Sequence, residues 1–343
     1  MRLICRRALG LALQLMPLAA AAWTGPGHQQ VGAIADRLLA GSPAQAQVQR
    51  ILAGRSLQEV AVWADCVKAV SSADDRHFAY TAGSRYPECR SFENAEDEAR
   101  MVDYAARNWK QCGSAKGPEH CHNQYHYADI ANLRDRYEAS ETGASDHDIV
   151  HAINAAVAVL QDRQAPAPFG IRDKREALTL LAHFVGDIHQ PLHVGAVYLD
   201  ALGQVVDPDR GGYDAATDTA GGNRILDHGH SLHLEWDAIA PEFQVDGERS
   251  AEMLALARRV PRTRGDLSQW ASGWADEALA LEHDGVFEGL RFRGLSDRAG
   301  AKGRQWSVSG VTRRYEVHAD RIKMQQISKA GARLAQLLAA IWP

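Results

Sequence analysis

Apolar side chains recur every three or four residues along most of this chain, which is the spacing of one face of an α-helix. In the first such segment, residues 28–40, the side chains of Val31, Ile34, Leu38 and Leu39 would share one face. Further segments with the same period cover residues 56–70, 145–161, 174–190, 266–286 and 318–342. The pattern therefore predicts a protein built mainly from amphipathic helices.

Several polar residues and one proline mark where these helices should begin and end. Ser56 and Glu59 have the spacing of a capping box, in which each side chain bonds the backbone amide of the other residue. Ser145 or Asp146 would cap the third helix. Pro191 has no amide hydrogen and should end the helix that precedes it.

Signals for β-strands and for a second domain are scarce. Two Gly- and Asp-rich stretches, Cys112–His122 and Asp200–Gly222, have the composition of loops. The sequence contains no internal repeat and no Pro- or Ser-rich linker. We therefore predict an all-α fold with a single domain and long loops.

The first 22 residues have the composition of a secretory signal peptide. Arg2, Arg6 and Arg7 form a basic start, an apolar stretch follows, and a run of alanines ends at Ala22. No later stretch reaches membrane-spanning length, so we expect residues 23–343 to be secreted or periplasmic, without an anchor. The full chain carries a net charge of −5. Removing three arginines makes it more acidic, which argues against tight electrostatic binding of duplex DNA.

Four cysteines remain after the expected cleavage, an even number in an oxidising compartment. Two disulfides are the ordinary interpretation of such a set, and four cysteines allow three pairings. We expect Cys66–Cys89 and Cys112–Cys121. A structural zinc site is the alternative, although the sequence has no pair of cysteines separated by two residues.

The segment "HFVGDIHQPLH", residues 183–193, places histidines and an aspartate in an otherwise apolar helix. His183 and Asp187 are four residues apart and would share one helix face. Pro191 would end the helix and let His193 turn back. "HLEWD" repeats the pairing with His233 and Asp237, and further candidates are His28, Asp65 and His126. A lone histidine is usually a core or surface residue, but two such pairs together indicate a metal site, and His and Asp are zinc ligands.

These motifs resemble those of the zinc-dependent single-strand-specific nucleases (type I nucleases), which are relatives of the bacterial zinc phospholipases C. The resemblance covers the whole expected mature chain. Its motifs, in order, are Trp23 followed by His28, "WAD" at 63–65, "HYAD" at 126–129, residues 183–193, "GGN" at 221–223, "HLEWD" and the C-terminal "AGARLAQLL". It implies a mostly helical fold that holds three zinc ions in a cleft.

The resemblance also implies which residues bind each zinc ion. The first ion would be bound by Asp65, His126, His183 and Asp187, and the second by His193, His233 and Asp237. The third would be bound by His28 and by the α-amino nitrogen and carbonyl oxygen of Trp23, with Asp187 bridging two ions. Cleavage before Trp23 would complete this site.

In two places the chain departs from the simpler members of the family. The segment between "WAD" and "HYAD" is longer and contains a second histidine, His77, which could be mistaken for the ligand that we assign to His126. The loop at residues 196–221 is also long, and we expect it to alter the mouth of the cleft.

Four residues are expected to contact substrate. Lys68 occupies a position where the family tends to have arginine, and Asn223 resembles the family's phosphate contact. Tyr127 would stack on a nucleobase, and Asp129 would hydrogen-bond the base edge. For each there is a simpler interpretation: a solvated lysine, a Gly-rich turn, a core aromatic, and a carboxylate that supports a histidine.

The expected chemistry is hydrolysis of phosphodiester bonds. Bound zinc lowers the pKa of a water and stabilises charge on the phosphate, and Asp65 would orient the nucleophile. The predicted substrates are single-stranded DNA and RNA, with 5′-phosphate products, and nucleotides that carry a 3′-phosphate. We expect a monomer without a stable protein partner. The alternatives are a zinc phospholipase C, in which glutamate would replace Asp237, and a non-catalytic periplasmic zinc-binding protein.

Overall fold

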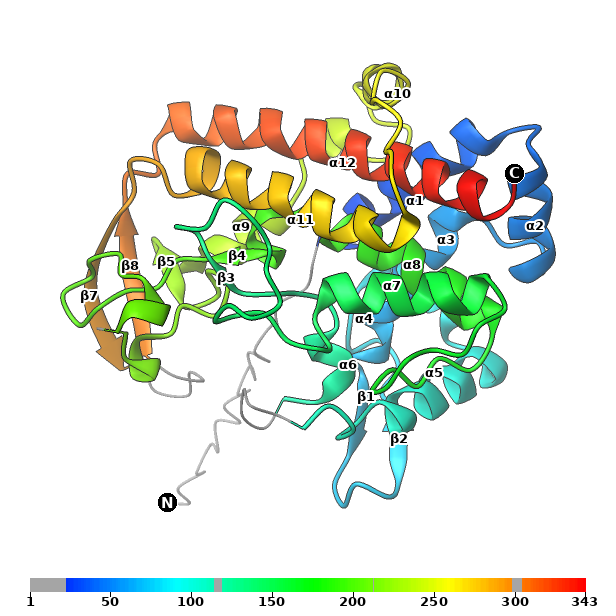
Figure 1. Cartoon of the computed structure of the whole chain (residues 1–343), viewed down its shortest axis with the longest axis horizontal. Coiled ribbons are helices and arrows are strands. Elements are labelled where there is room, and N and C mark those ends of the chain that lie inside the picture. The colour runs from blue at the N-terminus through cyan, green and yellow to red at the C-terminus, as the bar shows by residue number, and fades with distance from the viewer. Residues whose placement is uncertain (1–22, 114–118, 212, 298–303) are drawn as a thin grey trace, which may run out of the picture.

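The helix α8 (Lys174–Asp187) lies at the centre of the molecule, and all its residues from Glu176 to Asp187 are buried (Figure 1). The structure is a computed structural model that describes residues 23–113, 119–211, 213–297 and 304–343. The helices packed against α8 are α1 (Gly25–Leu39), α2 (Pro43–Ile51), α3 (Leu57–Val60), α4 (Trp63–Val67), α7 (Ile149–Leu160) and α12 (Arg313–Ile341). The predicted helical fold class is confirmed. The expected signal peptide lies outside the described residues.

The longest helix, α12, lies along α1, and the two backbones come unusually close. A Cβ atom on Gly331 of α12 would stand 2.6 Å from the Ile34 side chain and 2.9 Å from the Val31 carbonyl oxygen of α1. Only glycine fits this contact. The other α-helices are α5 (Ala95–Arg107), α6 (Cys121–Gln124), α9 (Leu232–Asp237), α10 (Ser250–Ala257) and α11 (Trp270–Leu281).

Short helical turns connect many of these elements. The 3₁₀ turns are η1 (Pro87–Phe92), η2 (Pro191–His193), η3 (Pro208–Arg210), η4 (Ala215–Thr217), η5 (Pro241–Phe243) and η6 (Leu267–Gln269). A π-helical turn, η7 (Glu282–Val286), follows α11 directly. Pro191 begins η2 after α8 has ended, as its sequence position predicted.

The sheets are small, and none of them was expected from the sequence. The strands are β1 (Val70–Ser72), β2 (Phe78–Tyr80), β3 (Ile130–Ala131), β4 (Gly195–Ala196), β5 (Ile225–Asp227), β6 (His230–Ser231), β7 (Arg291–Asp297) and β8 (Arg304–Ser309). β1 and β2 pair antiparallel, β3 and β4 pair parallel, and the remaining strands form a sheet in the order β6-β5-β8-β7. Figure 1 shows this last sheet at one end of the molecule, beyond the ends of α11 and α12.

The predicted helix over residues 56–70 is wrong as a single element. Ser56 and Glu59 do form the predicted capping box at the start of α3. The chain then turns at Ala61 and Val62 and begins the separate helix α4, and Val70 already belongs to β1. The break leaves the Ala61 carbonyl oxygen to accept a hydrogen bond from a side chain of α8.

Two other helix boundaries also differ from the prediction. The N-cap of α7 is Asp148, and not Ser145 or Asp146, because its carboxylate accepts hydrogen bonds from the amides of Val150 and His151. The helix α12 begins at Arg313, ahead of the predicted residue 318, since the Thr312 side chain caps it.

Both predicted disulfides are present. Cys66 of α4 is bonded to Cys89 of η1, and Cys112 is bonded to Cys121 at the start of α6.

Within the described residues, no helix combines the length and the apolar character that crossing a bilayer requires. In the long loop at 196–221, Asp207 and Asp209 pair with Arg134, which attaches this loop to the segment after β3.

Candidate metal centre

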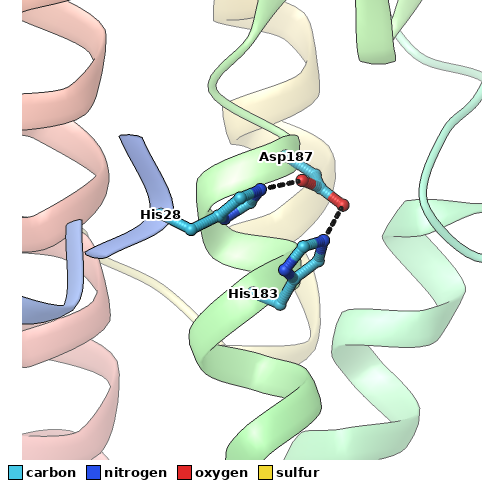
Figure 2. A group of neighbouring side chains, drawn as sticks. All are labelled: His28, His183 and Asp187. Atoms are coloured by element: carbon cyan, nitrogen blue, oxygen red, sulfur yellow. Dashed lines mark ion pairs between the residues drawn. The ribbon is translucent and has the colours of Figure 1, made fainter. Parts of the chain in front are cut away.

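The C-terminal half of α8 presents His183 and Asp187 on one face, and α1 places His28 opposite them (Figure 2). Asp187 Oδ1 lies 3.2 Å from His28 Nε2, and Asp187 Oδ2 lies 3.2 Å from His183 Nε2. The His28 and His183 rings are stacked, with 3.8 Å between their centroids. All three side chains are fully buried. The i,i+4 pair predicted from the sequence thus has a third partner from another helix.

A second group shares His183 with the first. It consists of Asp65 from α4, His126 from the segment before β3, and His183. His183 Nε2 is 3.1 Å from His126 Nδ1 and 3.8 Å from Asp65 Oδ1. His126 Nδ1 is also 2.9 Å from Asp187 Oδ2, so the two oxygens of Asp187 face different histidines.

A third group lies beside these two and consists of His193, His233 and Asp237. Asp237 Oδ1 is 3.8 Å from His193 Nε2, and Asp237 Oδ2 is 3.5 Å from His233 Nε2. His193 ends η2, while the other two residues are one turn apart on α9. The structure therefore brings together all eight predicted ligand side chains.

Backbone carbonyl groups orient three of the imidazoles. In each of these histidines Nδ1 donates a hydrogen bond to a carbonyl oxygen, which leaves Nε2 as the ligand atom. The pairs are His183 Nδ1 with Ala61 O at 2.6 Å, His193 Nδ1 with His126 O at 2.9 Å, and His233 Nδ1 with Gly221 O at 2.5 Å. Parallel pairing of β3 with β4 holds the segments of His126 and His193 together.

This arrangement fits bound cations. His193 Nε2 and His233 Nε2 face each other at 3.0 Å, although both Nδ1 atoms hold the ring protons. Two nitrogen lone pairs at this distance repel unless a cation lies against both. Asp187 Oδ1 and Asp237 Oδ2 are buried and accept no hydrogen bond from the described residues. Imidazole nitrogen and carboxylate oxygen are also the donor atoms that zinc accepts.

Burial keeps most of these histidines neutral, as metal ligands must be. It lowers the pKa of His28 to about 4 and that of His233 to about 3. Burial, together with the charges of Asp65 and Asp187, raises the pKa of Asp237 well above its usual value. A buried carboxylate in this position is stable as an anion only beside a positive charge, which a metal ion would supply.

Close packing of two glycines brings the start of α1 to the cluster. A Cβ on Gly186 would lie 2.8 Å from His28 Nδ1, and one on Gly27 would lie 2.7 Å from the Trp23 Cβ. The Trp23 ring is fully buried, and its Nε1 donates to Gly186 O at 2.9 Å. The expected role of Trp23 as a ligand through its backbone atoms stays a prediction.

The predicted substrate contacts lie around the same cluster. Lys68 is not a solvated lysine, because its side chain is 6% exposed and its Nζ is 2.8 Å from Asp65 Oδ1. Tyr127 is half-buried, and its hydroxyl donates to Glu119 Oε2 at 2.7 Å. Asp129 Oδ1 lies 3.3 Å from the position of a Cβ on Gly221, so it borders the "GGN" turn.

In that turn, Asn223 Nδ2 donates to Ala220 O at 2.8 Å, which shows the side-chain amide taking part in the turn itself. The positive φ values of Gly221 and Gly222, 56° and 85°, explain why glycines occupy those positions. The contacts of Lys68, Tyr127, Asp129 and Asn223 with substrate stay predictions.

The sequence did not indicate the role of Gln190. Its Nε2 donates to Asp237 Oδ1 at 2.7 Å and so orients a carboxylate of the third group. Its position inside the ligand-rich motif "HFVGDIHQPLH" was the one sequence feature that could have indicated a role at the cluster. The middle histidine of this motif, His189, points elsewhere and accepts a hydrogen bond from Arg333. His77 is 88% exposed and pairs with Asp74, so His126 is the histidine that joins the cluster.

A mostly helical fold with three adjoining groups of histidine and aspartate defines the class of zinc phospholipase C-like proteins. Within that class, a model of the S1/P1 nuclease family matches residues 23–343, and the chain belongs to this family. The family is zinc-dependent.

Three proteins that are similar to this chain are named as endonucleases or as a nuclease. Endonuclease 1 of Arabidopsis thaliana is 28% identical over 62% of this chain and 66% of its own length. Endonuclease 3 of the same plant is 25% identical over 46% of each chain. Nuclease PA3 of a Penicillium species is 24% identical over 74% of this chain and 71% of its own. The matches to both plant proteins thus span less than two thirds of those proteins.

Proposed function

We propose that this chain is an exported zinc-dependent nuclease that hydrolyses phosphodiester bonds of single-stranded DNA and RNA. The expected products carry 5′-phosphates, and nucleotides with a 3′-phosphate are further substrates. The observation that carries the proposal is the close approach of His193 Nε2 and His233 Nε2, 3.0 Å apart, inside a buried set of ligands. The names of the relatives, endonucleases and a nuclease, support it.

We infer three zinc ions per chain, bound by the ligand side chains of the three groups together with Trp23. Asp65, His126, His183 and Asp187 would hold the first, and His193, His233 and Asp237 the second. His28 and the backbone of Trp23 would hold the third, which requires cleavage after Ala22. The family match begins at residue 23 and supports this cleavage site. When bound, such ions activate a water and neutralise charge on the phosphodiester.

The residues of the chain would then bind and orient the substrate. Asp65 is anionic, since Lys68, against the effect of burial, lowers the pKa of its carboxyl group, and it would orient the attacking water. The Tyr127 ring would stack on one base, and the Asp129 carboxylate would accept a hydrogen bond from its edge. Asn223 would contact the phosphate.

Preference for single strands follows from this mode of binding. A base can reach Tyr127 and Asp129 only when it has left the duplex stack, which costs a few kcal/mol in paired DNA and much less in a single strand. Stacking on an aromatic ring returns about 1–3 kcal/mol per base. We expect the protein to act as a monomer without a membrane anchor.

The shared metal chemistry makes a zinc phospholipase C the nearest alternative, and a zinc-binding protein without turnover the next. The test uses the chain beginning at Trp23, incubated with single-stranded RNA, single-stranded DNA, duplex DNA and phosphatidylcholine, with and without a chelator. We expect rapid, chelator-sensitive hydrolysis of both single-stranded substrates. Hydrolysis of phosphatidylcholine alone would identify a phospholipase, and tight zinc binding without any turnover would identify a binding protein.

A further inference from the structure

The segment between β2 and α5 reaches the edge of the metal cluster, and it belongs to the part that is longer than in simpler family members. The disulfide Cys66–Cys89 joins its turn η1 to the residue that follows Asp65. The turn also packs against α1 and α4. Its Glu88 side chain lies so close to the start of α1 that a Cβ on Gly25 would be 2.5 Å from Glu88 Oε2.

Arg85, just before this turn, has buried hydrogen-bond donors that nothing in the described structure satisfies. Its Nε and Nη2 atoms are both buried without a hydrogen-bond partner. No ion pair within 4.0 Å links it to a carboxylate of the residues that the structure describes. Buried donors of a charged group that lack a partner are costly, so this edge of the half-buried guanidinium is suited to an anion that comes from outside the chain.

The two donors form one edge of the guanidinium group. Nε–H and Nη2–H point in the same direction, which is the geometry that binds two oxygens of one phosphate at once. The Arg85 Cζ also lies 5.5 Å from the centre of the Tyr86 ring, a contact that restrains the side chain.

Tyr86, the neighbour of Arg85, lies in an electrostatic environment to which ligand residues contribute. Burial, with the negative charges of Asp65, Asp237 and Glu88, raises the pKa of its hydroxyl group, while Arg85 opposes the shift. Asp65 and Asp237 belong to different ligand groups, so the Tyr86 hydroxyl lies within the field of both. The geometry agrees: the turn η1, which begins two residues after Arg85, is bonded through Cys89 to the residue after Asp65 and packs against α1, the helix of His28.

We propose that Arg85 forms a phosphate-binding subsite next to the metal cluster, with Tyr86 holding the guanidinium in place. The proposal rests on the proposed function, because it assigns the subsite to a phosphate group of the nucleic-acid substrate. It also accounts for Lys68, which replaces the arginine typical of the family and is paired with Asp65. The inserted segment supplies a guanidinium group from another part of the chain.

The test compares Arg85→Gln with Arg90→Gln in the zinc-loaded mature chain. Arg90 is an exposed arginine of η1, five residues after Arg85, so both variants lose one positive charge from the same segment. Calorimetry would measure the binding of inorganic phosphate, 5′-AMP and adenosine. We expect Arg85→Gln to weaken binding of phosphate and 5′-AMP by at least about tenfold, as the loss of two charge-assisted hydrogen bonds predicts, and to leave adenosine binding and zinc content unchanged.

Arg90→Gln should bind all three compounds as the unmodified chain does. Arg85→Lys keeps the charge but loses the paired donors, so it should bind phosphate with intermediate affinity. It replaces Arg85→Gln in the test if that variant does not fold. Equal phosphate binding in all variants would overturn the subsite, as would a loss of zinc or an equal loss of adenosine binding in both Arg85 variants. An unmodified chain that binds phosphate through Arg85 but does not cleave RNA would overturn only the proposed function.

Discussion

At the scale of single residues, Asp187 has the most partners in the candidate centre. Its Oδ1 faces His28, and its Oδ2 faces His126 and His183, at distances of 2.9 to 3.2 Å. The carboxylate is fully buried and anionic, because the imidazoles, against the effect of burial, lower its pKa well below the usual value. One side chain thus contacts histidines of two of the three groups.

We therefore expect Asp187→Asn to disturb two metal ions. The variant should lose two of the three zinc ions and at least about 100-fold in activity on RNA, since even residues that only support a ligand cost about 10–100-fold. Asn223→Ala is the comparison: it should keep all its zinc and lose about tenfold, the value of a phosphate hydrogen bond. Metal analysis and RNA kinetics on both variants check this, and the reverse order would contradict the bridging role.

Tyr127 offers a second test at this scale, because its ring and its hydroxyl can be removed separately. Tyr127→Ala should lose about 10-fold or more on single-stranded DNA, which corresponds to one lost stacking contact, and little on a small phosphodiester without a base. Tyr127→Phe keeps the ring and loses the hydroxyl with its hydrogen bond to Glu119, so it should behave almost normally. Equal losses on both substrates in Tyr127→Ala would mean that the ring supports the metal site.

The ligand residues were predictable where helical spacing links them. His183 with Asp187, and His233 with Asp237, follow from the four-residue period alone. His28, Asp65 and His126 were candidates from the sequence, but assigning them to particular ions needed the resemblance to a family, because they meet the others only through packing. Gln190 was missed, since its contact with Asp237 depends on the bend after α8, and the place of Arg85 in the proposed subsite depends on a disulfide.

At the scale of elements, long-range contacts explain where the predictions failed. The apolar period runs through residues 56–70, but the chain breaks after α3, and the Ala61 carbonyl oxygen accepts a hydrogen bond from His183. The strand β5 pairs with β8, about 80 residues further along, so no local pattern indicates their sheet. Local sequence predicted helices well because helical hydrogen bonds are themselves local.

The cap of α7 leads to a prediction on pH. The Asp148 side chain accepts a hydrogen bond from His151 Nδ1 at 2.9 Å, and this bond raises the pKa of His151. The protonated form is thus favoured in the folded state. Its stabilisation is full below the unfolded pKa of about 6.5 and is lost as pH rises through the folded pKa.

His151→Gln keeps a donor but cannot titrate. The difference in unfolding free energy between the unmodified chain and this variant should be larger at about pH 5 than at about pH 8. The side chain is 37% exposed, so we expect the change to stay below about 1 kcal/mol. Urea unfolding at the two pH values measures it. A difference that grows with pH would show that the assigned hydrogen bond does not control the titration.

At the scale of the whole molecule, the ligands come from segments far apart in the chain, between His28 and Asp237, and meet only in the folded state. Metal that binds the folded chain and not the unfolded chain stabilises the fold, and it would offset the repulsion between the facing imidazoles. The two disulfides restrain the chain beside the cluster. Cys66 of one bond directly follows Asp65, and Cys121 of the other lies shortly before His126.

We expect a cluster of three zinc ions, completed by the amino group of Trp23, to cleave single-stranded nucleic acid. The most direct test measures zinc content and RNA hydrolysis together, on a chain that begins at Trp23 and on one with a single extra residue before it. We predict three zinc ions and chelator-sensitive hydrolysis for the first chain, and one zinc ion fewer with little hydrolysis for the second. Full zinc content and full activity in the extended chain, or RNA hydrolysis that persists after zinc is removed, would contradict the account.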